Sequence, residues 1–363
     1  MADQQILREL ITNLLSKCGI SNEHAHITAD LLIAAELRDI PSHGLLRLAD
    51  YARMILNGRI NPNPNPRILH ESPSTILYDG DNGLGPVVSV KAMELAIKKA
   101  GQAGTGWVAV QNSNHFGIAA YYSMMALEHD MIGISMTNAN PLVAPTFSAE
   151  GLLGTNPIAI AVPAGEEPPL VADFATAAIA RGKVDLLHKK GMSIAEGFLQ
   201  DKEGQPATDP GILTKGGAIL PLGSTRDYGS HKGYCLAASV DILSAVLSGA
   251  NFGPFVPPSV AYLPLKDNLP GKGTGHFFGA MRIDAFRTSV SFKKDMDTWI
   301  RLFRGATPAS GHARVIIPGE PEREAEARNK INGIRMQKKV LEQLQPLFTE
   351  LGMEPYMDNS ELY

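Results

Sequence analysis

The amino-terminal part of the chain places its apolar side chains at helical spacing. Apolar positions recur every three or four residues over Asp3–Lys17, which predicts one helix. Ser21 is expected to cap a second helix that runs to about Arg38, and a third helix is expected to end near Gly58. The Asn-Pro repeat at residues 61–66 suits neither a helix nor a central strand and closes this helical segment.

Downstream of the repeat, short apolar runs alternate with helical patterns. We expect strands at residues 75–78, 106–111, 131–137, 158–162, 170–172, 279–283 and 288–292. We expect helices at residues 86–100, 117–129, 176–187, 233–248 and 320–344, the last followed by an interruption at Pro346. This alternation predicts an α/β core. The predicted organisation is an N-terminal three-helix subdomain over 1–70, the core over 71–318, and a C-terminal helical segment over 319–363 that packs back on the core.

Composition limits the compartment and the partners of the protein. Its 363 residues carry a formal net charge of -4, without the excess of Lys and Arg that a nucleic acid requires. The two cysteines, Cys18 and Cys235, lie far apart, which favours a reducing compartment over a disulfide scaffold or a zinc site. The amino terminus does not read as a secretory signal, and no apolar run approaches the roughly 20 residues that span a bilayer. We expect a cytoplasmic protein without a nucleic-acid or membrane partner.

Several common nucleotide-binding and catalytic motifs are absent from the sequence. There is no GxGxxG after a strand, which disfavours a Rossmann dehydrogenase, and no GxxxxGK[ST] loop for nucleoside triphosphates. There is no GxSxG elbow, which argues against a serine hydrolase of the α/β type. There is no HExxH, and His24 and His26 point in different directions on one helix, so no metal site is expected.

The segment Ser42–Tyr51 carries three side chains suited to acid substrates. If a helix begins near Ser42, then His43, Arg47 and Tyr51 recur every four residues and share one face. The Arg fork matches a carboxylate, and His titrates near neutral pH, so this face suits carboxylate binding and proton transfer. The alternative is an ordinary amphipathic helix whose polar side faces water, and the spacing alone leaves both interpretations open.

His115 is a second candidate for proton transfer. It lies in Asn112–Gly117, between a buried strand and the next helix, and loops at the carboxyl ends of core strands commonly carry chemistry. Asn112, Ser113 and Asn114 supply short polar side chains that can orient its ring. A structural histidine with both nitrogens hydrogen-bonded is the alternative.

Two further strand or helix ends are candidates for nucleotide binding. Asp173 closes a strand and can accept a hydrogen bond from a ribose hydroxyl, while Thr176 and the amides of the following helix can donate to a pyrophosphate. A plain N-cap role suits Asp173 equally well. Lys232 precedes another predicted helix and can hold a phosphate or ribose, although a lysine at a helix start is also well served by water.

Six segments in one order carry a family resemblance. They read SHGLLRLADY from Ser42, NSNHFG from Asn112, GTNPIAIAVP from Gly154, DFATAAIARGKV from Asp173, LPLGS from Leu220 and HKGYCLAASVDILSAVLSGANFG from His231. Over nearly the whole chain they resemble the type 2 malate/L-lactate dehydrogenase family, which includes sulfolactate and ureidoglycolate dehydrogenases, 2,3-diketogulonate reductase and a cyclic imine reductase. The resemblance implies a non-Rossmann dinucleotide-binding core with a mixed sheet, NAD or else NADP as cofactor, and a homodimer or higher homo-oligomer.

The resemblance also implies roles for individual residues. It assigns proton exchange with the substrate to His115, with His43 as the rival and Asp185 as a supporting residue. It assigns the substrate carboxylate to Arg47, with Ser42 and Tyr51 lining the same pocket. It assigns dinucleotide contacts to Asp173, Phe174, Ala175, Thr176, His231, Lys232, Pro318, Gly319 and Glu320.

The resulting prediction is hydride transfer between a nicotinamide and C2 of a small 2-hydroxy or 2-oxo acid, without a metal. Malate with oxaloacetate and lactate with pyruvate are the expected pairs. Ala49, Ala177 and residues 197–201 depart from the family pattern, and the last two bear on substrate and cofactor preference. The alternatives are reduction of another 2-oxo or cyclic 2-imino acid, and a non-catalytic protein that binds a small carboxylate. A three-helix DNA-binding unit is a further alternative, which the acidic balance opposes.

Overall fold

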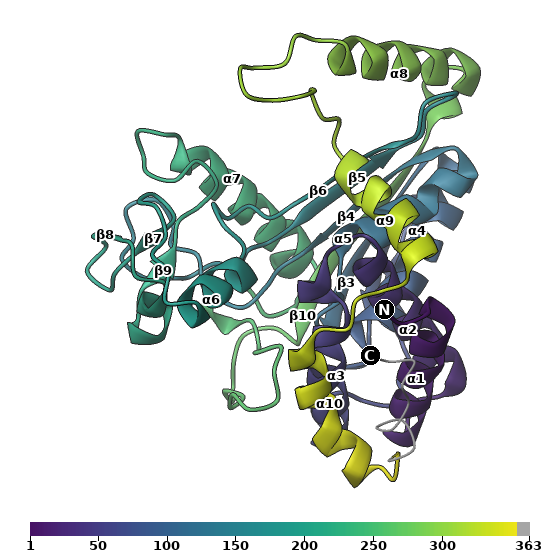
Figure 1. Ribbon diagram of the computed structural model, residues 1–363. Coiled ribbons are helices and arrows are strands. Elements are labelled where there is room, and N and C mark those ends of the chain that lie inside the picture. Colours follow the sequence, from purple (N-terminus) through teal and green to yellow (C-terminus); the bar gives the residue numbers. More distant parts are fainter. Residues whose placement is uncertain (354–363) are drawn as a thin grey trace.

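The protein is built around a seven-stranded mixed sheet, with a three-stranded sheet to one side (Figure 1). The computed structural model describes residues 1–353. The helices are α1 Gln4–Lys17, α2 Asn22–Leu37, α3 Leu48–Leu56, α4 Gly85–Ala103, α5 Ala119–Met125, α6 Arg181–Lys189, α7 Ser230–Asp241, α8 Ser289–Arg304, α9 Glu320–Asn332 and α10 Lys338–Glu350. The strands are β1 Arg67–Glu71, β2 Thr75–Asp79, β3 Thr105–Ser113, β4 Met131–Thr137, β5 Ile158–Val162, β6 Leu170–Phe174, β7 Leu199–Gln200, β8 Pro206–Ala207, β9 Ala218–Ile219 and β10 Thr274–Arg282. The predicted α/β class and the mixed sheet are confirmed.

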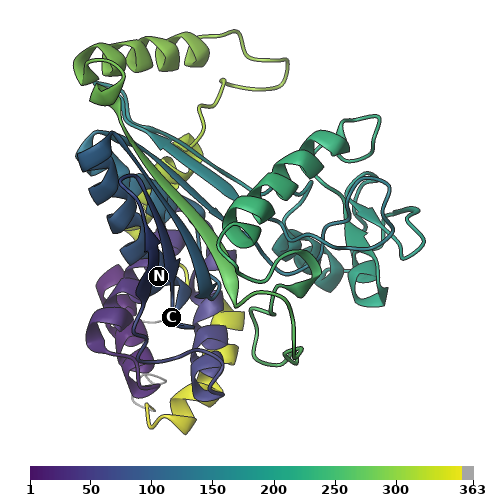
Figure 2. The ribbon, with the colours of Figure 1, turned by 180° about the vertical axis from the view of Figure 1, so that it is seen from behind.

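The large sheet runs in the order β1-β2-β3-β10-β4-β5-β6. Only the β2–β3 pair is parallel, and every other neighbouring pair in this sheet is antiparallel. Strand β10, from late in the chain, lies between β3 and β4, where Figure 2 shows it in the middle of the sheet. The sheet is therefore completed by a distant segment, which the local sequence pattern does not reveal.

Glycines on opposite faces of the sheet let helices approach it closely. A Cβ on Gly106 or Gly133 would lie 2.0 Å from a backbone oxygen of α4 or α5, respectively. On the other face, a Cβ on Gly275 would lie 2.2 Å from a backbone oxygen of the π-turn Ile242–Val246, which continues α7. Helices α4 and α5 thus cover one face, and α7 with its π-turn covers the other (Figure 2).

The amino-terminal helices form where the apolar spacing predicts them. Asp3 caps α1 and Ser21 caps α2, each by accepting backbone N–H groups of the first turn. At the other end of the chain, α9 packs on α2 and α10 packs on α3, so the C-terminal helices return to the N-terminal ones (Figure 1). Within residues 1–353 no helix has the length and apolar character to cross a membrane.

The segment that follows α2 is not the single helix expected from Ser42 onward. Two 3-10 turns, Pro41–His43 and Leu45–Arg47, precede α3, and Gly44 between them departs from helical geometry. The carboxyl of Glu36 accepts a hydrogen bond from the Leu45 N–H at 2.7 Å, and a Cβ on Gly44 would lie 2.3 Å from its Oε1. Packing against α2 therefore replaces the first helical turn with a tighter one.

Other predicted elements also need correction. Residues 288–292 form the start of α8 instead of a strand, because the Thr288 hydroxyl caps that helix by accepting the Ser291 N–H. The helix expected at 176–187 begins only at Arg181, and the one expected at 320–344 breaks between α9 and α10. Strand β1 and the three-stranded sheet were not predicted, and β1 starts at Arg67, before the domain boundary drawn at residue 70.

The smaller lobe has its own apolar core, distinct from that of the large sheet. Its buried members come from two separate stretches of sequence: Val143, Leu153, Ala177, Ile179, Val184, Ile194, Leu199, Ile219 and Ala237. These stretches include the three-stranded sheet, α6 and part of α7 (Figure 1). The core predicted over 71–318 therefore contains two packed units.

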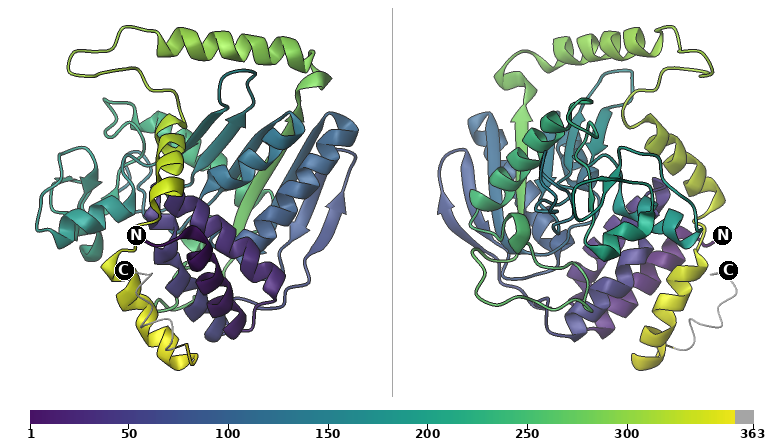
Figure 3. Two further views of the ribbon diagram at one scale, coloured as in Figure 1. Left: turned by 45° about the vertical axis from the view of Figure 1, so that its right-hand side comes forward. Right: turned by 90° about the vertical axis from the view of Figure 1, so that its left-hand side faces the viewer.

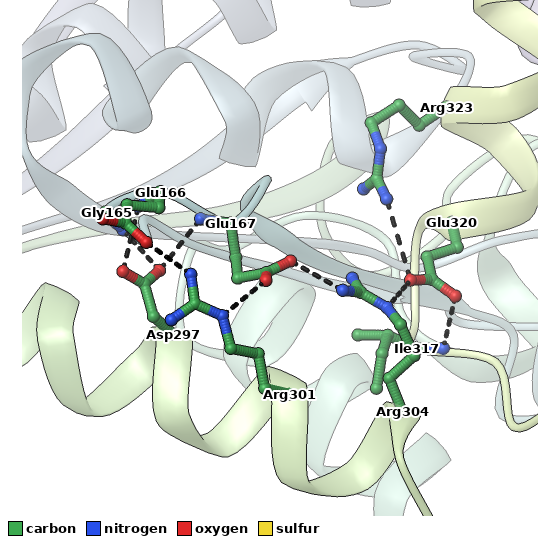
Figure 4. Close-up of polar contacts among 9 residues, drawn as sticks. All are labelled: Gly165, Glu166, Glu167, Asp297, Arg301, Arg304, Ile317, Glu320 and Arg323. Carbon is green, nitrogen blue, oxygen red and sulfur yellow. Dashed lines mark hydrogen bonds and ion pairs between the residues drawn. The ribbon is translucent and has the colours of Figure 1, made fainter.

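Helix α8 lies at the end of the sheet opposite the N-terminal helices (Figure 1), and charged side chains connect it to the sheet (Figure 4). Asp297 accepts hydrogen bonds from the backbone N–H groups of residues 165–167, in the turn between β5 and β6. Arg304 bridges Glu167 and Glu320, at 2.7 and 2.8 Å. The start of α9 is thereby connected to the β5–β6 turn through α8.

Candidate active site

The loop that carries His115 leaves β3 and enters α5. Asn114 donates hydrogen bonds to the backbone oxygens of Asn82 and Gly83, which hold the loop against the segment before α4. A Cβ on Gly85 would lie 2.1 Å from the His115 carbonyl oxygen, so only glycine permits this approach. The loop is therefore held against the start of α4 and the segment before it, by the Asn114 side chain and by the close approach of the backbone at Gly85.

His115 meets two of the predicted residues from the Ser42–Tyr51 segment. The Tyr51 hydroxyl lies 2.8 Å from Nδ1 of His115. The His43 ring stacks on the His115 ring, with centroids 5.5 Å apart and an interplanar angle of 21°. Gly117 N–H also donates to Nδ1 of His115, so that nitrogen is an acceptor and Tyr51 donates to it. Substrate chemistry at this ring therefore falls on Nε2.

The charge of Arg47 acts on both imidazoles. The Nε of Arg47 donates to the Ser42 carbonyl oxygen at 2.8 Å, and its Nη1 lies 3.3 Å from a carboxylate oxygen of Asp50. Ser42 Oγ in turn lies 2.9 Å from Nδ1 of His43. These contacts orient the guanidinium while leaving part of its fork of donors for a substrate carboxylate.

Both histidines are neutral at physiological pH in the protein without substrate. Burial and the nearby Arg47 charge lower the pKa of His43 to about 4. Burial, Arg47 and His43 lower the pKa of His115 well below its usual value. The histidines therefore add no charge to the site, and the Arg47 guanidinium, which also pairs with Asp50, provides a cation for an anion.

Further charged residues lie close to Arg47. Loss of solvation and the adjacent Lys189 ammonium lower the pKa of Lys339, Asp185 opposes this effect, and Arg47 adds to it. Lys339 comes from the first turn of α10, which contacts the turn that carries Arg47, and Lys189 ends α6. A Cβ on Gly182 of α6 would be 3.6 Å from the Ser42 Cβ. Helix α6 therefore lies beside the N-terminal helical segment, as the teal and purple ribbons show in Figure 3.

Asp185, predicted to support the catalytic histidine, is engaged elsewhere. Its carboxylate pairs with Arg181 one turn earlier on α6, at 3.6 Å, and both side chains are more than half exposed. Its charge also acts on Lys339. The structure therefore groups Asp185 with the cations around Arg47, and the group hydrogen-bonded to His115 is Tyr51.

Asp173 lies at the end of β6, as predicted, and caps α5 rather than the helix that follows in sequence. Its carboxyl accepts the Ala120 N–H at 2.9 Å. Loss of solvation raises the pKa of Asp173 to about 6, and the hydrogen bond from Ala120 opposes this rise. The neighbouring Phe174 is 39% exposed and Ala175 is half-buried, so this segment offers both a carboxyl and apolar surface to a ligand.

Thr176 does not begin a helix, which corrects the expectation for this residue. Its side chain is fully buried, and its hydroxyl donates to the backbone oxygens of Thr155 and Asn156. The hydroxyl is committed to these contacts and does not offer the predicted donor to a pyrophosphate. The Thr176 carbonyl oxygen accepts the Leu222 N–H, and α7 packs against Leu222 through Gly233.

The remaining residues predicted to bind dinucleotide lie at two helix starts. His231 and Lys232 are in the first turn of α7, and Nδ1 of His231 lies 2.9 Å from Arg226. This cationic helix start suits an anion such as a pyrophosphate or phosphate.

Pro318, Gly319 and Glu320 precede and begin α9. The Pro318 carbonyl oxygen accepts the Val171 N–H, which places this segment beside β6. The Glu320 carboxylate is bound by Arg304 and by the Ile317 N–H at 3.0 Å (Figure 4). Its carboxylate therefore has a structural role in organising the start of α9.

Sequence reasoning missed several charged or titratable residues near the site. Asp50 lies within a quoted motif, three residues after Arg47, and that spacing alone signals an ion pair. Lys189, Lys339 and His276 carried no signal, because each comes from a segment far from both motifs in sequence. Their proximity to the site depends on tertiary structure.

Comparisons with known proteins agree with this arrangement. The malate/L-lactate dehydrogenase family matches residues 2–345. Malate dehydrogenase from Pyrococcus horikoshii is 42% identical over 96% of this chain and 94% of the relative. Ureidoglycolate dehydrogenase (NAD(+)) from Escherichia coli K12 is 33% identical over 92% of this chain and 91% of the relative.

A solved structure extends the similarity to three dimensions. Sulfolactate dehydrogenase from Methanocaldococcus jannaschii superposes with a TM-score of 0.88 and 40% identity, covering 98% of this chain and 99% of that one. The family resemblance read from the motifs is thus confirmed over nearly the whole chain. The chain belongs to the malate/L-lactate dehydrogenase family, which implies a nicotinamide cofactor, and is an oxidoreductase of 2-hydroxy acids.

Proposed function

We propose that the protein interconverts a small 2-oxo acid and its 2-hydroxy acid, with Arg47 binding the C1 carboxylate and His115 exchanging a proton with the C2 oxygen. The observation that carries this proposal is the convergence of the Tyr51 hydroxyl and the His43 ring on His115, beside the Arg47 guanidinium. A nicotinamide cofactor, when bound, exchanges hydride with C2. The residues below supply binding, orientation and the proton.

Arg47 orients the substrate through the coplanar N–H donors of its guanidinium. Because Ser42 and Asp50 hold the guanidinium through Nε and Nη1, a carboxylate binds its remaining N–H groups in a defined orientation. Holding the reacting carbon and the proton donor in register accounts for roughly 7 to 11 kcal/mol of the barrier in well-oriented reactions. Ser42 also lies within hydrogen-bond distance of His43 and so connects the carboxylate site to the stacked imidazoles.

The proton passes through Nε2 of His115. In the reduction direction the ring must carry a proton on each nitrogen before it donates to the developing alkoxide. The positive charge of Arg47 lowers the pKa of His115, and a bound carboxylate offsets that charge, so substrate binding favours the protonated ring. The Tyr51 hydroxyl then rotates and accepts the new Nδ1–H. His43 is the rival donor, and its stacked ring keeps it close to the same oxygen.

For the cofactor we propose NAD, with NADP as the alternative, bound between β6 and the starts of α7 and α9. The cationic start of α7, with Arg226, His231 and Lys232, suits the pyrophosphate. The Asp173 carboxyl at the end of β6 suits a ribose hydroxyl. A relative named as an NAD(+) enzyme supports the choice of NAD over NADP.

For the substrate we propose acids with a second negative group, such as oxaloacetate or malate, ahead of pyruvate or lactate. Arg47, Lys189 and Lys339 together carry three positive charges, against the two carboxylates of Asp50 and Asp185. An excess of positive charge stabilises a dianion more than a monoanion. The relatives named for malate and sulfolactate support this preference.

We also propose a homodimer in the cytoplasm. Beyond the cationic start of α7, this helix and its π-turn expose Leu236, Ile242, Val246 and Leu247, between 38 and 57% accessible, and such apolar patches commonly mark interfaces between subunits. Cys18 and Cys235 are both free thiols, as suits a reducing compartment.

The test is the absorbance of NADH and NADPH during turnover. Each reduced cofactor is paired with oxaloacetate, sulfopyruvate, pyruvate, diketogulonate and a cyclic 2-imino acid. We expect oxidation of NADH with oxaloacetate or sulfopyruvate to give the highest kcat/KM. Lack of turnover with every acid and both cofactors refutes the proposed function. Faster turnover of the imino acid than of the 2-oxo acids identifies the protein as an imine reductase instead.

A further inference from the structure

His276 is a fully buried histidine in the middle of the large sheet, and the mechanism above does not use it. It lies in β10, opposite Thr137 of β4 and Val110 of β3. The register between β10 and β3 shifts at residues 274–276, at the point where β3 ends and the His115 loop begins. This irregularity brings the ring of His276 beneath that loop.

The hydrogen bonds of His276 define one neutral form of its ring. Thr137 Oγ1 lies 3.0 Å from the Gly275 carbonyl oxygen and 2.7 Å from Nδ1 of His276. Because the single hydroxyl proton of Thr137 is donated to a carbonyl, the hydroxyl accepts the Nδ1–H of His276. Nε2 of the neutral ring is then an acceptor, and the Ser113 hydroxyl donates to it at 2.8 Å.

His276 therefore contacts the loop on both sides of His115. Ser113 lies two residues before His115, and its hydroxyl is held by Nε2 of His276. Phe116 follows His115 directly, and its ring stacks on the His276 ring with centroids 4.8 Å apart and an angle of 11°. Phe116 and Ser113 are both fully buried, so these contacts are shielded from water.

The ring also has an electrostatic reason to stay neutral. Burial lowers the pKa of His276 to about 3, although the backbone oxygens of Asn114 and Gly275 oppose this shift. A neutral ring beneath the loop adds no positive charge to a site that must accept a proton.

We propose that His276 is a positioning residue for proton transfer: through Ser113 on one side and Phe116 on the other, it holds His115 where the Tyr51 hydroxyl and the His43 ring meet it. This inference rests on the proposed role of His115. Displacement of a catalytic group by about 1 Å costs roughly 100-fold in rate, so loss of either contact is expected to reduce kcat.

Two substitutions separate the contacts of the two ring nitrogens. In His276→Gln the amide extends to the position of Nε2 and keeps the contact with Ser113, whereas in His276→Asn the shorter amide replaces only Nδ1 and keeps Thr137. Ser113→Ala removes the partner of Nε2 from the other side. We expect kcat to fall about 10- to 100-fold in His276→Asn and in Ser113→Ala, with KM for oxaloacetate within about threefold of the parent enzyme, and to fall less than about threefold in His276→Gln.

The double variant and the pH profile distinguish positioning from plain loss of stability. If His276 acts through Ser113, the His276→Asn, Ser113→Ala double variant is no slower than the worse single variant. We also expect the apparent pKa of His115, followed by NMR of its ring Cε1–H, to shift in His276→Asn and to be restored in His276→Gln. Equal losses in the Gln and Asn variants, additive effects of the pair, or an unshifted His115 titration overturn the inference.

Failure of the proposed function has a different signature. If His115→Asn retains full turnover, His115 does not carry the proton, whatever the His276 variants do. If His115→Asn is slow while His276→Asn matches the parent enzyme, the proton role stands and the positioning role of His276 is refuted.

Discussion

The Tyr51 hydroxyl lies 2.8 Å from Nδ1 of His115, although 64 residues separate the two in sequence. Tyr51 is almost completely buried, so water does not compete for this contact. The hydroxyl donates to the neutral ring and accepts from the protonated one, because a phenol serves as both donor and acceptor. It is therefore the group that allows His115 to change protonation state without losing its orientation.

Replacing Tyr51 with Phe is expected to lower kcat for oxaloacetate reduction about 10- to 100-fold. This loss is smaller than the whole rate enhancement that a positioned general acid supplies, because His115 itself remains. The imidazolium also loses its acceptor, so the limb of the pH–rate profile that reports the protonated ring moves to lower pH. Steady-state rates measured between about pH 5 and 9 test both effects. Tyr121→Phe, whose ring packs edge-on against Tyr122, is the control. An unchanged rate and profile in Tyr51→Phe refutes the coupling.

His115→Asn and His43→Asn identify the proton carrier. We expect His115→Asn to lower kcat by about 100-fold or more, because it removes the general acid. Binding of NADH, followed by its fluorescence, is expected to stay unchanged, since the residues predicted to contact the cofactor lie on other elements. If His43→Asn loses turnover and His115→Asn does not, the stacked His43 is the proton carrier instead of His115.

Lys339→Met is expected to discriminate between acids of different charge. Lys339 is partly exposed, so its loss is worth about 1 kcal/mol, or roughly a fivefold rise in KM for oxaloacetate. KM for pyruvate is expected to change little, because pyruvate lacks the second carboxylate. Lys338→Met is the matched control: that side chain is 90% exposed and pairs with Glu342. Equal effects on both acids rule out a role of Lys339 in recognising the second charge.

Glu36→Gln is expected to change how stability depends on pH. Burial raises the pKa of Glu36 from 4.5 to about 7, so the folded state holds this proton more tightly than the unfolded state. The native chain therefore loses stability as pH rises from about 4.5 to above 7, by up to about 3 kcal/mol. Gln keeps an acceptor for the Leu45 N–H and does not ionise.

The measurement for Glu36→Gln is urea unfolding at about pH 5, near the lower end of the window in which the carboxyl titrates, and at about pH 8.5, above that window. The free energy of unfolding of the variant, relative to that of the parent, is expected to rise between the two pH values. A constant difference at both pH values refutes the raised pKa, whatever its size.

Ile242→Lys is expected to weaken the homodimer. Ile242 is 54% exposed in the single chain and begins the π-turn that continues α7. Burying a lysine charge in an apolar interface is costly, so sedimentation equilibrium is expected to show monomers at concentrations where the parent is dimeric. Ile331→Lys, at an 85% exposed position on α9, serves as the control. A parent chain that sediments as a monomer contradicts the proposal at once.

The parts of the fold that local patterns specify were predicted well. Strands β4 and β5 have the predicted ends, because each is a short, mostly apolar run between polar or turn-forming residues. The two-residue strands β7–β9 have no pattern long enough to detect. Residues 288–292 are rich in Thr, Val and Phe, which suits a strand, but the cap at Thr288 and the following turns make them helical.

The candidate site divides in the same way. Arg47, His43, Tyr51 and His115 were predicted from two motifs, and the structure brings them together. The helix assumed for the first motif was wrong, because Glu36 reshapes the turn at Gly44. Lys339 and His276 were not predicted, since their proximity depends on the packing of α10 and on the place of β10 in the sheet.

The place of β10 also has a consequence for biosynthesis. Strands β3 and β4 leave the ribosome long before β10, and until it arrives each presents an unpaired edge of backbone donors and acceptors. A nascent chain that stalls before residue 274 therefore exposes the unpaired backbone edges of β3 and β4, which can form hydrogen bonds with other chains. Translation of this one strand is the step that covers the facing edges of β3 and β4.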